Sequence, residues 1–177
     1  MKMKAILEKV MLVMMLFLPL ITFVRADGSA KIGQTNIDFS QMKAPTPLEN
    51  AVIANDFQLV SKLASKANVN VQTNSMGGPL MLAVYNDNFA IAELLLKRGA
   101  SVETKMSNGI TPLFLAVTRN QVTLVKLLLD YKANPNYAVA GIYPIDVAIS
   151  VGYLGIEEML KQKGAKERPT LKRLKKK

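Results

Sequence analysis

The side chains that most often carry acid–base, nucleophilic or metal chemistry are missing from this sequence of 177 residues, which contains no histidine and no cysteine. An imidazole base, a thiolate nucleophile and a zinc site of the usual kind are therefore excluded. Carboxylates remain as acids or bases, but Asp56, Asp87 and Asp130 fall where turns or helix ends are expected, and Glu157 and Glu158 share one expected helix. No nucleophile, base and orienting group come together, so we expect no enzymatic activity, no cofactor and no metal.

The strongest signal in the sequence is a period of 32 to 33 residues. The period is marked by four prolines, Pro47, Pro79, Pro112 and Pro144. Each of them is followed four residues later by an alanine. Thr46 and Thr111 precede two of the prolines, where a hydroxyl can cap a helix and a proline in the first turn costs no hydrogen bond. Gly78 and Tyr143 precede the other two and lack that hydroxyl.

Each proline predicts a short inner helix of about two turns, then a tight turn and an outer helix. The turns carry residues that tolerate a left-handed backbone: Asn55, Asp87, Asn120 and Gly152. Apolar residues then resume at helical spacing: Leu59, Val60, Leu63; Ile91, Leu94, Leu95; Leu124, Leu127, Leu128; Ile156, Met159, Leu160. We expect these outer helices to end at Lys66-Ala67, Gly99-Ala100, Lys132-Ala133 and Gly164-Ala165. Loops with Gly77, Gly109 and Gly141, called fingers below, lead to the next proline.

This pattern, with Thr-Pro-Leu at residues 46–48 and 111–113, resembles the ankyrin-repeat family from about residue 44 to residue 166. The resemblance implies an all-α solenoid of about four helix-turn-helix units, in which each unit buries its apolar face only by stacking on its neighbours. The expected units lie near residues 44–73, 74–106, 107–138 and 139–166.

The sequence departs from the family two residues after each proline. Where the family commonly has histidine, this chain has Glu49, Met81, Phe114 and Asp146, so the hydroxyl-to-imidazole hydrogen bond that ties neighbouring loops is not expected. Polar residues also replace apolar ones in the outer helices of the two terminal units, at Lys62, Glu157 and Lys161. Polar faces suit the ends of an array, so we expect four units.

The formal net charge of +10 is carried by the two ends of the chain. Residues 161–177 hold nine Lys or Arg against one Glu, and residues 1–26 hold four against one Glu, so the residues between them are nearly neutral. The basic tail, residues 167–177, is expected to be a solvated end, with adhesion to an anionic membrane surface as the alternative. Nucleic acid is not an expected partner, because no aromatic residue interleaves the basic ones.

The N-terminal residues have the pattern of a signal peptide. Three lysines, Lys2, Lys4 and Lys9, precede an apolar run from Val10 to Val24. We expect cleavage after Ala26, a linker over residues 27–43, and export to a periplasmic or secreted location, with a bacterial envelope favoured. An uncleaved signal anchor is the alternative, although the run is shorter than the roughly 20 residues that a membrane span needs.

The resemblance implies binding of other proteins through the fingers and the exposed positions of the inner helices. The finger positions are Ser107, Asn108, Ile110, Val139, Ala140 and Ile142, and the helix positions are Tyr85, Asn86, Thr118, Arg119 and Ser150. Tyr and Arg are enriched at interface hot spots, and we expect Ile110 and Ile142 to align as an apolar strip. We therefore expect an exported, monomeric module whose concave face binds an envelope, secreted or host protein. The alternative is a surface-attached structural protein that its basic tail holds on an anionic membrane.

Overall fold

The computed structural model describes residues 30–32, 35–37, 45–73 and 76–166, so the expected signal peptide and basic tail lie outside the described residues. The chain divides into two compact units, Met1–Lys43 and Ala44–Lys177. In the first unit, β1 (Ala30–Ile32) pairs antiparallel with β2 (Thr35–Ile37), and Ala30 lies opposite Ile37. These strands lie within residues 27–43, which were expected to form a linker. Strands of three residues are too short to give a periodic signal in the sequence.

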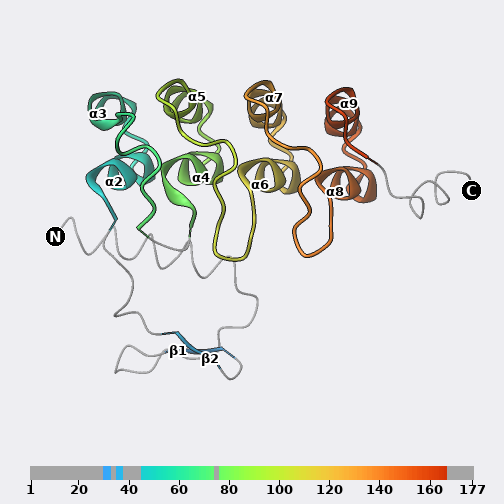
Figure 1. The fold of residues 1–177 in the computed structure, drawn as a ribbon, viewed down its shortest axis with the longest axis horizontal. Helices are drawn as coiled ribbons and strands as arrows, with labels where there is room; N and C mark the ends of the chain where they lie inside the picture. The colour runs from blue at the N-terminus through green and yellow to red at the C-terminus, as the bar shows by residue number, and fades with distance from the viewer. Residues whose placement is uncertain (1–29, 33–34, 38–44, 74–75, 167–177) are drawn as a thin grey trace, which may run out of the picture. The chain divides into compact units, whose positions relative to one another are not determined.

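The second unit is a row of helix pairs in two layers (Figure 1). Its described inner helices are α2 (Pro47–Ile53), α4 (Gly78–Tyr85), α6 (Pro112–Thr118) and α8 (Pro144–Val151). Its described outer helices are α3 (Phe57–Leu63), α5 (Phe89–Lys97), α7 (Val122–Asp130) and α9 (Leu154–Gln162). The loops that follow α5 and α7 extend from the inner layer, away from the outer helices. The expected all-α repeat solenoid is confirmed for this unit.

The caps and turns follow the local chemistry of the sequence. Thr46 Oγ1 accepts from the Glu49 N–H at 3.1 Å, and Thr111 Oγ1 accepts from the Phe114 N–H at 3.2 Å. The four expected turn residues all have positive φ: Asn55 (55°), Asp87 (55°), Asn120 (56°) and Gly152 (84°). In α4 the N-cap is Gly77, whose φ is +83° and whose missing Cβ would lie 3.0 Å from the backbone of Lys105. The finger therefore needs glycine there for two separate reasons.

Three outer helices end at the expected left-handed residues, and the first does not. The three positive φ values belong to Gly99 (91°), Lys132 (68°) and Gly164 (85°). The expectation for Lys66 was wrong, because α3 already ends at Leu63 and Lys66 does not take a positive φ. Asn68 bonds locally instead: its side chain accepts from the Ser65 N–H and donates to the Leu63 carbonyl, both at 2.8 Å. Such side-chain bonds compete with a continuing helix.

One hydrophobic core runs through the array between the two layers. Its largest fully buried apolar side chains come from all four repeats: Leu48, Leu80, Met81, Ile91, Leu95, Leu113, Leu124, Leu128, Ile145, Ile156 and Leu160. Leu59 lies outside this core and is 40% exposed. Glu157, expected to give the last unit a polar outer face, is buried and pairs with Lys161 at 2.8 Å. Within the part of the chain that the structure describes, no helix combines the length and the apolar character that crossing a membrane would require.

A repeated polar position ties each repeat to the next. Side-chain oxygens accept backbone N–H groups of the following repeat in three aligned pairs: Asn70 from Ser101 (2.7 Å), Glu103 from Asn134 (2.7 Å) and Asn136 from Lys166 (2.8 Å). The two asparagines also donate through Nδ2 to the carbonyls of Gly99 and Gly164. Stacking is therefore held by polar contacts at the loops as well as by the apolar core.

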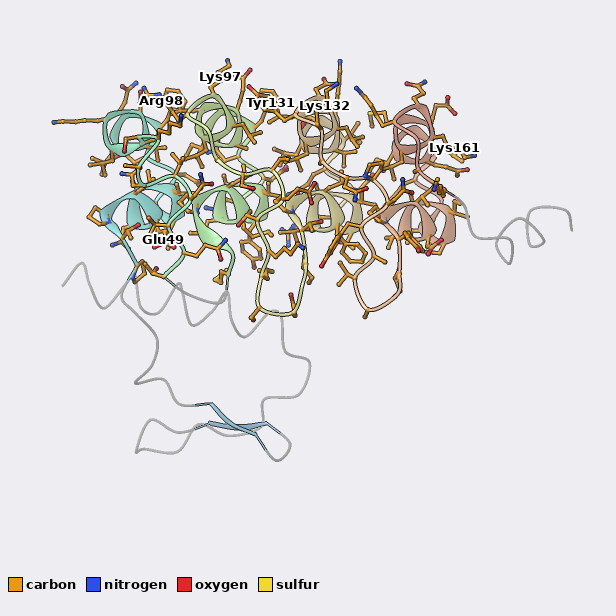
Figure 2. All side chains as sticks on the ribbon, viewed as in Figure 1. Glu49, Lys97, Arg98, Tyr131, Lys132 and Lys161 are labelled. Atoms are coloured by element: carbon orange, nitrogen blue, oxygen red, sulfur yellow. The ribbon has the colours of Figure 1, made fainter. Side chains whose placement is uncertain are left out.

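The buried carboxylate of Glu49 ties a loop to the first inner helix. Its side chain, in the inner layer (Figure 2), is 0% exposed and accepts from the Thr46 N–H at 2.8 Å, which completes a capping box. The Thr73 hydroxyl, in the following finger, donates to the same oxygen at 2.5 Å. In the last repeat, Asp146 accepts from the Tyr143 N–H at 3.0 Å. The loop tie that the missing histidine would have made is thus replaced in the first repeat by a carboxylate–hydroxyl bond.

Candidate functional site

The structure brings two of the expected binding residues into contact. Tyr85 ends α4 and Arg119 directly follows α6, and the Arg119 Cζ lies 4.9 Å from the centre of the Tyr85 ring. A guanidinium over an aromatic face gains about 0.5–1 kcal/mol at an exposed site. Arg119 is exposed, whereas Tyr85 is half-buried and packs on the core. We call this pair the Tyr85–Arg119 platform: a fixed apolar surface that carries an accessible set of hydrogen-bond donors.

Asn86, next to this platform, is used to join repeats. Its Nδ2 donates to the Val52 carbonyl at 3.1 Å and to the Asn55 Oδ1 at 3.3 Å. Asn88 donates to the same Asn55 oxygen at 3.3 Å. Because its amide donors already bond within the array, Asn86 has less to offer a partner than Tyr85 or Arg119.

The two hydroxyl residues of the inner helices are exposed. Thr118 Oγ1 donates to the Leu115 carbonyl at 2.8 Å, and Ser150 Oγ donates to the Val147 carbonyl at 3.0 Å. Each hydroxyl oxygen keeps acceptor capacity after that donation. These positions can therefore accept a hydrogen bond from a partner without breaking one in the array.

The finger between α5 and α6 is shaped by its own backbone. Ser107 and Asn108 are exposed, and the Asn108 Oδ1 accepts from the Ile110 N–H at 3.2 Å, as in an Asx turn. Ile110 is half-buried and packs against the core.

The finger between α7 and α8 is closed by a pair of backbone bonds. Val139 and Ile142 exchange two hydrogen bonds of 2.9 Å, and Ala140 at the tip has a φ of +49°. Ile142 is 46% exposed. The expected strip of Ile110 and Ile142 is therefore uneven, with most of its accessible apolar surface on Ile142.

A second cation–aromatic contact, which the sequence reasoning missed, joins the same two fingers. The Lys105 Nζ lies 4.1 Å from the centre of the Tyr137 ring. The two residues are 32 positions apart, so comparing aligned finger positions for a cation and an aromatic ring would have found the pair. Like the Tyr85–Arg119 platform, it holds a basic group in place across neighbouring repeats.

The chemistry of this face is that of recognition. In the described part of the chain, no group of three or more acidic residues is arranged to hold a metal ion. The groups that the fingers and inner helices present are guanidinium, ammonium, aromatic ring, hydroxyl and amide, which can stack, donate and accept. Such groups suit binding to another protein surface.

Comparisons with known proteins agree with this architecture. The family model described as Ankyrin repeats (3 copies) matches residues 20–106 and 80–170. An ankyrin repeat protein of Fowlpox virus is 36% identical over 123 residues, which are 65% of this chain and 36% of that protein. One from Rickettsia bellii is 31% identical over 106 residues, 56% of this chain and 30% of that protein. One from Treponema pallidum is 46% identical over 56 residues, 32% of this chain and 19% of that protein.

The chain spans about a third or less of the length of these curated relatives. The two matches of the family model together cover most of the chain, including all the described helices. The chain therefore belongs to the ankyrin-repeat family.

Proposed function

We propose that this chain is an exported interaction module that binds a partner protein through its fingers and the exposed ends of its inner helices. Ankyrin repeats are protein–protein interaction modules, and the relatives above carry that name. The observation that supports this face most directly is the Tyr85–Arg119 platform. Tyr and Arg dominate interface hot spots, and here they are already stacked on each other.

The scaffold makes this face ready to bind. Tyr85 packs on the core and Arg119 is held over its ring, so both side chains lose little conformational freedom when a partner arrives. A partner with a carboxylate or backbone carbonyl next to an apolar side chain would use both parts of the platform. The fork of the guanidinium would take the oxygen, and the exposed Ile142 would extend the apolar contact.

The binding face is tested by removing the platform. A tagged chain is cross-linked in the envelope fraction, the captured protein is identified by mass spectrometry and purified, and its affinity is measured by calorimetry. Tyr85→Ala with Arg119→Ala should weaken binding at least tenfold, and it should also lower the melting temperature because Tyr85 packs on the core. Arg119→Ala alone should weaken binding with little change in melting temperature, because changes at an exposed residue usually cost within about 0.5 kcal/mol. Tyr131→Ala with Lys126→Ala is the matched control, since it removes the same kinds of side chain from the outer layer. Equal affinity for both double variants would move the site off the platform.

Export is proposed from the lysines and the apolar run at residues 2–24. The expected mature protein begins at Asp27 and fractionates outside the cytoplasm. Amino-terminal sequencing of the fractionated protein checks this, and Met1 on cytoplasmic protein would refute it.

A second candidate function is adhesion to an anionic membrane, and the charge of the outer layer favours it. Residues 57–66, 89–98, 122–132 and 154–166 hold nine Lys or Arg against four acidic residues. Figure 2 shows Lys97 and Lys132 on the outer layer, away from the inner helices. Co-sedimentation with phosphatidylserine vesicles separates the two functions, because adhesion through exposed charges should weaken steeply between low and physiological salt. Binding through the Tyr85–Arg119 platform should depend on salt much less.

A further inference from the structure

The two basic residues of the inner helices and fingers are held differently from the lysines of the outer layer. On the outer helices, three lysines pair with carboxylates: Lys97 with Glu93, Lys161 with Glu157 and Lys163 with Asp130. Lys105 and Arg119 lie over aromatic rings instead, and among the residues that the structure describes neither forms an ion pair. Both side chains are exposed, so their charges are fixed in position and accessible to an anion.

The acidic groups around them are mostly engaged within the array. Five acidic residues belong to the described inner helices, their turns and the loops that connect the repeats: Glu49, Asp56, Asp87, Glu103 and Asp146. Glu49 and Asp146 are buried, and the Glu103 carboxylate accepts from the Asn134 N–H at 2.7 Å. Asp56 caps α3, and Asp87 lies in the turn between α4 and α5. The charge that this face can offer to a partner is therefore mainly cationic.

The two cations belong to opposite ends of the inner helix α6, which lies between α4 and α8 (Figure 1). The Met106 N–H donates to the Ile110 carbonyl at 2.9 Å, which closes the base of the finger and sets Lys105 beside the start of α6. Arg119 directly follows the last residue of α6. Because α6 has seven residues, the backbone positions of the two cations are separated by about 10 Å.

We propose that the partner presents an acidic segment that crosses α6, with one carboxylate on Arg119 and another on Lys105. This inference rests on the proposed binding face and adds the chemistry of its partner. A guanidinium can bind a carboxylate through two N–H donors, and an ammonium binds it as a point charge. Positive groups on one surface and negative groups on the other guide the two proteins together and fix the register of the contact.

The separation of the two cations limits the spacing of the acidic residues. In an extended segment, side chains four positions apart share a face and lie about 13 Å apart. In a helix, side chains seven positions apart share a face and lie about 10 Å apart. The segment therefore carries Asp or Glu at one of these two spacings.

Peptide selection on the full chain tests this chemistry before the partner is known. A phage library of random dodecapeptides is selected on the immobilised chain, and peptides that also bind the Lys105→Gln/Arg119→Gln variant are removed. This step discards the peptides that the basic outer layer holds. The remaining peptides should carry two acidic residues four or seven positions apart. A remaining set without this acidic pair, or no remaining peptide at all, would overturn the proposal.

Fluorescence polarisation with the most enriched peptide measures the contribution of each cation. Lys105→Gln and Arg119→Gln should each weaken binding at least about fivefold, because each leaves one carboxylate without its partner. Lys62→Gln with Lys126→Gln removes two exposed charges from the outer layer and should leave the affinity unchanged. An equal loss in this control would show that the peptide responds to overall charge, and it would overturn the proposal.

The acidic segment and the binding face can fail separately. If the partner captured from the envelope fraction loses affinity for Tyr85→Ala but keeps it for Lys105→Gln with Arg119→Gln, the acidic segment is wrong and the face stands. If its affinity is unchanged for all of these variants, the face itself is wrong.

Discussion

Removing the buried carboxylate of Glu49 should destabilise the first repeat strongly. Glu49→Ala leaves the Thr46 N–H without its 2.8 Å acceptor and the Thr73 hydroxyl without its 2.5 Å acceptor. Loss of a helix cap costs about 0.5–2 kcal/mol, and loss of a hydrogen bond to a charged group costs about 1.5–3 kcal/mol. We therefore expect the free energy of unfolding to fall by roughly 2–4 kcal/mol.

Urea denaturation followed by far-UV circular dichroism measures this loss. Glu93→Ala is the matched control, because Glu93 sits on the surface of α5 in a 3.0 Å pair with Lys97 and such pairs contribute little. Combining Glu49→Ala with Thr73→Val in a double-mutant cycle should give a coupling of about 1 kcal/mol or more. A loss below about 0.5 kcal/mol, or no coupling to Thr73, would show that the carboxylate does not hold the two segments together.

Lys132→Gly should raise the free energy of unfolding by roughly 0.5–1 kcal/mol, because glycine adopts the φ of +68° with less strain; a lower urea midpoint would contradict this. Leu127→Ala should lower the free energy of unfolding by roughly 2–5 kcal/mol and speed hydrogen exchange throughout the array. Met159→Ala should speed exchange mainly in α8 and α9. Equal acceleration along the array in the Met159 variant would mean that the repeats unfold together. Lys163→Ala should raise the pKa of Asp130 in an NMR titration, because the hydrogen bond from Lys163 is the largest cause that holds this pKa below its usual range. A carboxyl group whose pKa is lowered by folding stabilises the protein above the unfolded-state pKa, and this stabilisation is lost as the pH falls through the folded-state pKa. An Asp130 pKa that stays unchanged in the variant would show that Lys163 does not lower it.

The expected binding residues could be mapped from the repeat, but their contacts could not. Tyr85 and Arg119 were predicted as exposed positions of two inner helices, and only stacking of the repeats puts the guanidinium over the ring. Lys105 and Tyr137 meet in the same way, across one repeat. Ile110 and Ile142 occupy aligned positions but differ in exposure, because exposure depends on what lies beside each finger.

The sequence by itself determined the array of this protein: its period, its capping threonines and its left-handed turn residues Asn55, Asp87 and Asn120. These features depend on steric limits and hydrogen bonds within a few residues, which the local sequence contains. Tertiary structure alone decided the burial of Glu49, whose partner Thr73 is 24 residues away. It also decided how far the apolar side chains at aligned positions are exposed, because burial is set by the packing of neighbouring repeats.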